Sequence, residues 1–270
     1  MNGRAIGVFD SGIGGLTVMA ALKRRLPNER ILYLGDTARV PYGTKSPVTI
    51  QRYSLQVADF LLERSVKILV VACNTASAWA IDKLQAHSPV PVFDVIKPGC
   101  RRAAEASRSG KIGVIGTSAT IRSEAYPSCI RKLRPDANIS SRACPLFVPL
   151  AEEGWLDKPV TNMVIEDYLQ PLAEEGIDTL VLGCTHYPLL APAIGRFMGP
   201  AVELISSSEA TAEVVEKELK ERNLLRELPS ERDAIFLTDH SATFHEAMTY
   251  FLNGEPVSVE LVDIHRPTGE

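Results

Sequence analysis

The stretch Lys67–Ala78, KILVVACNTASA, and the stretch Asp178–Leu189, DTLVLGCTHYPL, share one pattern in the two halves of the chain. Each begins with a short apolar run and continues with a cysteine, Cys73 or Cys184, which threonine follows within two positions. Such runs predict buried strands, and the polar residues after them predict helix starts. A duplicated fold with a thiol at the equivalent point of each half can place two thiols across one site.

The rest of the chain repeats this organisation. Short β-branched runs alternate with helix-like stretches, which predicts an α/β fold with mainly parallel sheets. The segment Lys111–Thr117, KIGVIGT, resembles Arg4–Ser11, RAIGVFDS, and a strand candidate follows each cysteine at a similar distance, near Phe93 and near Leu204. We interpret this as a duplication that produces two similar α/β lobes, related by a pseudo-twofold axis, with a site in the cleft between them.

Composition and charge exclude several classes of protein. The 270 residues carry a net charge of −4 without a strongly basic stretch, so we expect no nucleic-acid partner. No run reaches the ~18 apolar residues of a membrane span, and the N-terminal residues lack the apolar stretch of a signal peptide. Five cysteines without a CxxC pair predict free thiols and a cytoplasmic protein.

Polar residues follow the predicted strands at five places. Parallel sheets bind ligands beyond the carboxyl ends of their strands, so these residues predict one shared site. Helix capping explains any single motif equally well, but capping does not require cysteine. The motifs are Asp10-Ser11-Gly12, Gly35-Asp36-Thr37, Cys73-Asn74-Thr75, Thr117-Ser118 and Cys184-Thr185-His186.

The motifs favour thiol chemistry over cofactor or metal chemistry. The glycines of residues 12–15 match neither the dinucleotide fingerprint nor a P-loop, although such a turn favours an anion such as a carboxylate. Nothing near Cys184 and His186 completes a zinc site, and His240 and His245 are five positions apart, a spacing that puts two residues on different faces of a helix, so we expect no metal. A thiol at a helix N-terminus is expected to have a pKa below about 8.5. His186 is a further candidate activator of Cys184.

Four motifs together resemble the glutamate racemases, within the aspartate/glutamate racemase superfamily. They occur in the order and spacing of that family, and the resemblance covers essentially the whole chain. The tail motif FLTDHSATF (Phe236–Phe244) departs from the Thr-Ser-Gly of many members. The matching motifs are FDSGIGGLTV (Phe9–Val18), LGDTARVPYG (Leu34–Gly43), ACNTASA (Ala72–Ala78) and GCTHYPLL (Gly183–Leu190).

The resemblance implies interconversion of L- and D-glutamate without any cofactor, which supplies D-glutamate for peptidoglycan synthesis. It implies that Cys73 and Cys184 are the two acid/base thiols. Asp10, Glu152 and His186 are implied as the polar groups that adjust them. The implied substrate-binding residues are Asp10, Ser11, Pro41, Tyr42, Gly43, Asn74, Thr75, Thr117, Thr120, Thr185 and His186.

The resemblance also implies a discontinuous first lobe. Residues 1–97 and 207–270 would form lobe A, and residues 98–206 would form lobe B. The C-terminal tail, which pattern alone leaves unassigned, would then belong to lobe A. Members of the family are usually homodimers, so we expect a homodimer, with an interface that the resemblance does not define.

Three alternatives remain open from the residues alone. The first is an aspartate or hydantoin racemase with the same chemistry and another pocket. The second is a hydrolase that uses Cys184 and His186 and in which Cys73 is dispensable. The third is a metabolite-binding regulator without turnover. The racemase reading requires Cys73 and Cys184 to face each other across one cleft.

Overall fold

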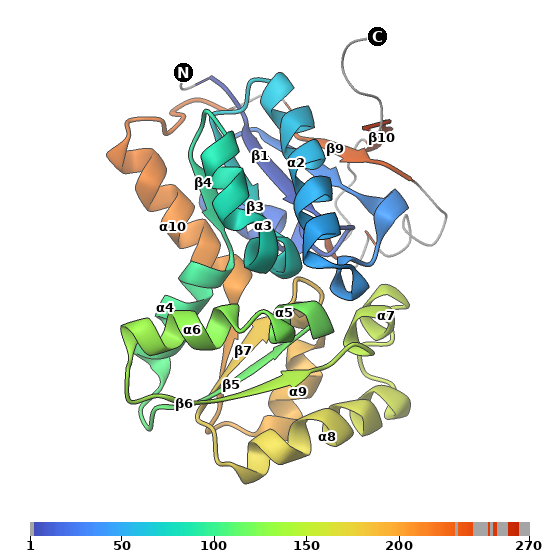
Figure 1. Ribbon diagram of the computed structural model, residues 1–270, viewed down its shortest axis with the longest axis vertical. Helices are drawn as coiled ribbons and strands as arrows, with labels where there is room; N and C mark the ends of the chain where they lie inside the picture. Colours follow the sequence, from blue (N-terminus) through green and yellow to red (C-terminus); the bar gives the residue numbers. More distant parts are fainter. Residues whose placement is uncertain (1–2, 230–231, 240–247, 249–250, 253–258, 265–270) are drawn as a thin grey trace.

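The strands form two separate parallel sheets. In a computed structural model, residues 3–229, 232–239, 248, 251–252 and 259–264 are described. Their strands form a six-stranded sheet in the order β10-β9-β2-β1-β3-β4 and a four-stranded sheet in the order β6-β5-β7-β8. Each pairing between these strands is parallel. The α/β fold with parallel sheets that the sequence predicts is therefore confirmed. Figure 1 shows the larger sheet in the upper part of the molecule and the smaller sheet in the lower part.

Helices cover both faces of the larger sheet. One face packs against α1 (Leu16–Arg25) and α10 (Ser207–Glu221), and the other packs against α2 (Pro47–Glu63) and α3 (Asn74–His87). Strands buried on both faces have nearly continuous apolar sequences, as the central strands do here. The strands of this sheet are β1 (Ile6–Asp10), β2 (Ile31–Gly35), β3 (Ile68–Val71), β4 (Val92–Asp94), β9 (Ala234–Leu237) and β10 (Val259–Leu261).

The smaller sheet is covered in the same way. Helices α4 (Ile96–Ala106) and α6 (Ala125–Leu133) pack on one face. On the other face lie α7 (Phe147–Glu152), α8 (Pro159–Glu174) and α9 (Ala191–Met198). The short helix α5 (Ser118–Arg122) follows the first strand. The strands are β5 (Lys111–Gly116), β6 (Asn138–Ala143), β7 (Thr179–Gly183) and β8 (Glu203–Ser206).

The two sheets share one strand order. The order β2-β1-β3-β4 in the larger sheet corresponds to β6-β5-β7-β8 in the smaller one, and β9 and β10 extend the larger sheet beyond β2. Cys73 and Cys184 follow β3 and β7, which are equivalent strands beside the central strand of each sheet. Helices α4 and α10 pack side by side where the part with the larger sheet meets the part with the smaller sheet (Figure 1). This matched order agrees with the duplication read from the sequence.

Some local predictions hold and others fail. The pattern Ser46-Pro47 predicts an N-cap followed by proline at the first helical position. The structure confirms it, because Ser46 Oγ accepts from the Thr49 N–H at 3.4 Å at the start of α2. Ser206 and Glu209 stand at capping-box spacing, which predicts a side-chain cap at the start of α10. Ser206 makes no such bond, so this prediction is wrong. The pattern of residues 243–252 predicts a helix, but of these only residues 248, 251 and 252 are described. His240 and His245 lie outside the described residues. Among the described residues, no helix is long and apolar enough to cross a membrane.

A buried ion pair ties the segment after α10 to the larger sheet. Lys67, just before β3, places its Nζ 2.6 Å from Glu29 Oε2, and both side chains are almost fully buried. The same Nζ donates to the Leu224 carbonyl at 2.7 Å, and the Arg226 N–H donates to Glu29 Oε1 at 2.8 Å. The pair thus fixes the segment after α10 to the end of the larger sheet at which β2 and β3 begin.

Substituting Lys67→Met should lower the free energy of unfolding by about 3–5 kcal/mol, because Glu29 would keep a buried charge without its partner. Urea denaturation followed by circular dichroism measures this. The matched control is Lys217→Met, which removes a lysine from an exposed ion pair with Glu221 and should change stability by less than about 0.5 kcal/mol. Equal effects of the two substitutions would contradict the assigned role of the pair.

Candidate active site

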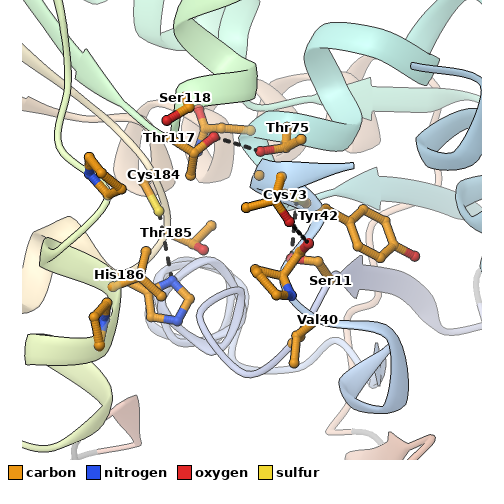
Figure 2. Close-up of a pocket in the computed structure, with 18 of the residues that line it drawn as sticks. Ser11, Val40, Tyr42, Cys73, Thr75, Thr117, Ser118, Cys184, Thr185 and His186 are labelled. Carbon is orange, nitrogen blue, oxygen red and sulfur yellow. Dashed lines mark hydrogen bonds between the residues drawn. The ribbon is translucent and has the colours of Figure 1, made fainter. Parts of the chain in front are cut away.

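The carboxyl ends of strands from both sheets open on one pocket of about 320 Å³, a volume suited to a small ligand. Figure 2 shows Cys184 and His186 on one side of this pocket and Cys73, Ser11 and Tyr42 on the other. The predicted site residues that line it are Ser11, Pro41, Tyr42, Gly43, Cys73, Asn74, Thr75, Thr117, Glu152, Cys184, Thr185 and His186.

Two predicted residues, Asp10 and Thr120, lie behind the pocket wall. Asp10 is buried at the end of β1, where its Oδ2 accepts the N–H groups of Gly12 at 3.3 Å and Gly15 at 2.9 Å. Thr120 is buried and joins its hydroxyl to those of Thr75 and Thr117. Neither residue is among those that line the pocket, but each bonds to residues that are: Asp10 to Gly12, and Thr120 to Thr75 and Thr117.

The pocket also has an apolar wall that motif reasoning missed. Pro145, Val148 and Pro149, around the start of α7, line it together with Val40. The segment Pro145–Gly154, PLFVPLAEEG, contains three of these residues, but Glu152 is the only one of its residues that the family resemblance implies for the site. Their apolar surface limits the water around a bound ligand, which strengthens electrostatic interactions within the site.

Cys73 is held as a buried thiol. It is the N-cap of α3, where its Sγ accepts from the Ala76 N–H at 3.4 Å and donates to Ser11 Oγ at 3.5 Å. Burial, with the nearby charge of Asp10, raises the Cys73 pKa to about 12 in spite of these hydrogen bonds. The expectation of a lowered pKa is therefore wrong for this thiol, because desolvation outweighs the effect of the helix terminus.

Cys184 has a different environment. Its Sγ lies 3.7 Å from His186 Nδ1, and His186 Nε2 lies 2.9 Å from Glu152 Oε1. Burial lowers the His186 pKa, but the hydrogen bonds and charges of Cys184 and Glu152 outweigh it and raise this pKa to about 10. His186 is consequently a cation at neutral pH and places a positive charge beside the Cys184 sulfur.

The Tyr42-Gly43 wall is anchored from behind by Asp36. The Tyr42 hydroxyl donates to Asp36 Oδ2 at 2.5 Å, and Arg39 Nε lies 2.6 Å from the same oxygen. Thr238, at the end of β9, donates to Asp36 Oδ1 at 3.1 Å. The buried carboxylate thus connects the tail strand to the pocket wall, a role that its position after β2 did not reveal.

Glycine is required where the two sheets' loops meet. A Cβ at Gly14 would lie 2.4 Å from both His186 Cε1 and Thr185 Oγ1. The Thr17 hydroxyl donates to the Thr185 carbonyl at 3.1 Å, on the turn that opens α1. The glycine turn after β1 and the loop after β7 are therefore in direct contact.

Three hydroxyls form a second connection between the sheets. Thr75 Oγ1 lies 3.0 Å from Thr117 Oγ1 and 3.2 Å from Thr120 Oγ1. Thr75 follows Cys73, whereas the other two belong to the end of β5 and to α5. Among the described residues, no group of three or more His, Cys, Asp or Glu side chains is arranged to hold a metal ion.

Comparison with known proteins identifies the family. Residues 6–215 match the Asp/Glu/Hydantoin racemase family. The chain belongs to this family. Among its racemase relatives, the glutamate racemase of Geobacter metallireducens is 53% identical, with 93% of this chain and 94% of the relative covered. The glutamate racemase of Syntrophus aciditrophicus is 49% identical, with 96% of each chain covered.

Solved structures of racemases have the same fold. The glutamate racemase isoform RacE1 from Bacillus anthracis superposes with a TM-score of 0.94 at 39% identity, covering 97% of this chain and 98% of that one. The glutamate racemase from Francisella tularensis in complex with D-glutamate gives 0.92 at 39% identity, covering 98% and 99%. An aspartate racemase homologue from Pyrococcus horikoshii, at 15% identity and a TM-score of 0.57 over 80% of this chain and 99% of that one, shares the fold.

The charge of His186 depends on Glu152 and can be measured by titration. Substituting Glu152→Gln should lower the His186 pKa below about 10, because one acceptor and its negative charge are lost. NMR of the imidazole nitrogens between pH 5 and 11 follows it, with the exposed neighbour Glu153→Gln as control. Protonated His186 should also stabilise the folded state of the unchanged protein. Its contribution to the free energy of unfolding should be fully present below about pH 6.5 and should be lost as pH rises through about 10. An unchanged titration in Glu152→Gln would contradict this dependence.

Proposed function

We propose that this protein is a cofactor-independent glutamate racemase that interconverts L- and D-glutamate, with Cys73 and Cys184 as its two acid/base groups. The observation that carries the proposal is that cysteines from two equivalent strand ends line one pocket. The relatives named as glutamate racemases, and the Francisella tularensis racemase in complex with D-glutamate, support glutamate as the substrate.

The reaction needs one group on each face of the α-carbon. A thiolate on one side removes the α-proton, and a thiol on the other side donates a proton to the resulting carbanion, which inverts the centre. The former thiolate ends as a thiol and the former thiol ends as a thiolate. The opposite enantiomer therefore reacts with the roles of the two cysteines exchanged.

The two cysteines have unequal electrostatic surroundings. Cys73, with its raised pKa and with Asp10 nearby, is a protonated donor at neutral pH. His186, which Glu152 supports, lies beside Cys184 and would balance the negative charge on this sulfur when it acts as a base. We assign Cys184 as the base and Cys73 as the acid for the enantiomer whose α-hydrogen faces Cys184.

Neutral donors around the pocket suit the carboxylates of glutamate. Hydroxyls of Ser11, Thr75, Thr117 and Thr185, and the amide of Asn74, belong to the lining or to its hydrogen-bond network. N–H groups at the start of α3 add a partial positive charge. Donors placed where charge develops on the α-carboxylate stabilise the planar carbanion.

Further parts of the proposal rest on the resemblance to the family. They are a role in supplying D-glutamate for peptidoglycan synthesis, a cytoplasmic location and a homodimeric state. The division into lobe A, residues 1–97 with 207–270, and lobe B, residues 98–206, is a proposal of the same kind. It is supported by the pairing of β9 with β2 and by the separate smaller sheet.

Removing either thiol should abolish racemisation. Cys73→Ala and Cys184→Ala should each lose activity toward both enantiomers, because each leaves one face of the α-carbon without its acid or base. Circular dichroism of L-glutamate measures turnover. In D2O, the D-glutamate formed by the unchanged protein should carry deuterium at Cα.

The control for these substitutions is Cys129→Ala, which removes a half-buried thiol outside the pocket and should leave turnover unchanged. Full retention of the original hydrogen at Cα would exclude the two-base mechanism. A Cys73→Ala variant that still hydrolyses its substrate, through an acyl-enzyme on Cys184, would instead establish the hydrolase alternative.

The contact at Gly14 offers a test of how closely the two loops must approach. Gly14→Ala should lower kcat/KM for glutamate by about 100-fold, because the added methyl displaces Thr185 and His186 and hence Cys184. The matched control is Gly195→Ala in α9, where the added Cβ makes only an ordinary contact of 3.6 Å. Wild-type kcat/KM in Gly14→Ala would show that this contact does not position the thiol.

A further inference from the structure

Tyr126 lies between the two cysteine motifs and behind the pocket wall. Its hydroxyl donates to Asn74 Oδ1 at 2.7 Å, and Asn74 directly follows Cys73. Its ring packs against Gly183, which directly precedes Cys184, so closely that a Cβ there would lie 3.1 Å from Tyr126 Cε2. One buried side chain of α6 therefore contacts the neighbour of each thiol.

Only one of the two polar atoms of the Asn74 side-chain amide has a hydrogen-bond partner among the described residues. The residue is 2% exposed and lines the pocket. Its Oδ1 accepts from Tyr126, whereas its Nδ2 has no hydrogen-bond partner among the described residues. A buried donor without a partner costs free energy, so an unpaired amide in a ligand pocket indicates a group that a ligand satisfies.

The orientation of this amide follows from the chemistry of Tyr126. A phenol has a single proton to donate, and burial raises the Tyr126 pKa well above its ordinary value, so the proton is retained. The Ser207 side chain, at the start of α10, lowers this pKa in part but does not outweigh burial. Because the phenol proton goes to Asn74, the asparagine must turn its oxygen toward Tyr126, and its NH2 group is left for the pocket.

We propose that Tyr126 is a positioning residue that orients the Asn74 amide so that its NH2 group donates to a carboxylate of the bound amino acid. The same side chain spaces the segment after Cys73 from the segment before Cys184. This inference rests on the proposed racemase function and adds to it the residue that determines which atom of Asn74 the substrate meets.

Loss of the phenol hydroxyl leaves the amide free to rotate. In the rotated state Asn74 Oδ1 faces the substrate carboxylate, and an acceptor then meets an anion. A hydrogen bond to a charged group is thereby lost from substrate binding, which corresponds to a rise in KM of about 10-fold or more. The effect falls mainly on binding, because the thiols keep their own hydrogen bonds.

The first experiment measures Tyr126→Phe, which removes the hydroxyl and keeps the ring against Gly183. The KM for L-glutamate should rise about 10-fold while kcat changes less than threefold. The matched control is Tyr168→Phe, which removes a hydroxyl on the other face of the smaller sheet and should leave both constants unchanged. A wild-type KM in Tyr126→Phe would overturn the proposal.

A double-mutant cycle then separates positioning from general support. In an Asn74→Ala background, Tyr126→Phe should have no further effect on KM, because the amide through which it acts is absent. An equal rise in KM in both backgrounds would overturn the proposal and would mark Tyr126 as a structural residue only.

A measurement without turnover distinguishes failure of this inference from failure of the proposed function. In 15N-labelled protein, the Asn74 side-chain NH2 signal, assigned by its loss in Asn74→Ala, should shift when D-glutamate is added. It should also shift in Tyr126→Phe without ligand. An NH2 signal unaffected by D-glutamate would overturn the inference even in an active racemase. If the protein does not racemise glutamate but both shifts are observed, the proposed function is refuted. The inference that Tyr126 orients the Asn74 amide would then still stand.

Discussion

The close contact between the glycine turn after β1 and the loop after β7 is the constraint on which the rest of the site depends. Only a residue without a side chain fits at Gly14, because a Cβ would meet His186 and Thr185 at 2.4 Å. The Thr17 bond to the Thr185 carbonyl and the three-threonine cluster hold the same approach at other points. These contacts bring the carboxyl ends of two independent sheets to one pocket, where each sheet contributes one cysteine.

The symmetry of the backbone is not repeated in the electrostatics. The strand orders β2-β1-β3-β4 and β6-β5-β7-β8 correspond, and the cysteines follow equivalent strands. Cys73 nevertheless lies near a buried carboxylate, Asp10, which together with burial keeps the sulfur protonated. Cys184 lies beside the His186 cation, which Glu152 supports. A pair of lobes with one fold thus places its two thiols in unequal electrostatic surroundings.

The sequence predicted more about the strands than about the polar network. Apolar runs revealed β1, β3, β5 and β7, because a strand buried on both faces needs a nearly continuous apolar sequence. Strand β6, Asn138–Ala143, was missed because it lies at the edge of the smaller sheet and its sequence NISSRA is mostly polar. The lining residues Pro145, Val148 and Pro149 were missed because apolar residues outside strands carry no local signal of a pocket.

By itself the sequence determined the α/β alternation, the duplication and the strand ends that carry cysteine, because these depend on residues close together along the chain. The tertiary structure decided that Asp10 and Thr120 support the pocket wall from behind, and that the Cys73 pKa is raised. It also decided that Tyr126 meets Asn74 across 52 positions of sequence. Desolvation and hydrogen bonding depend on which distant groups are packed together, and only the folded arrangement of the two sheets brings those groups into contact.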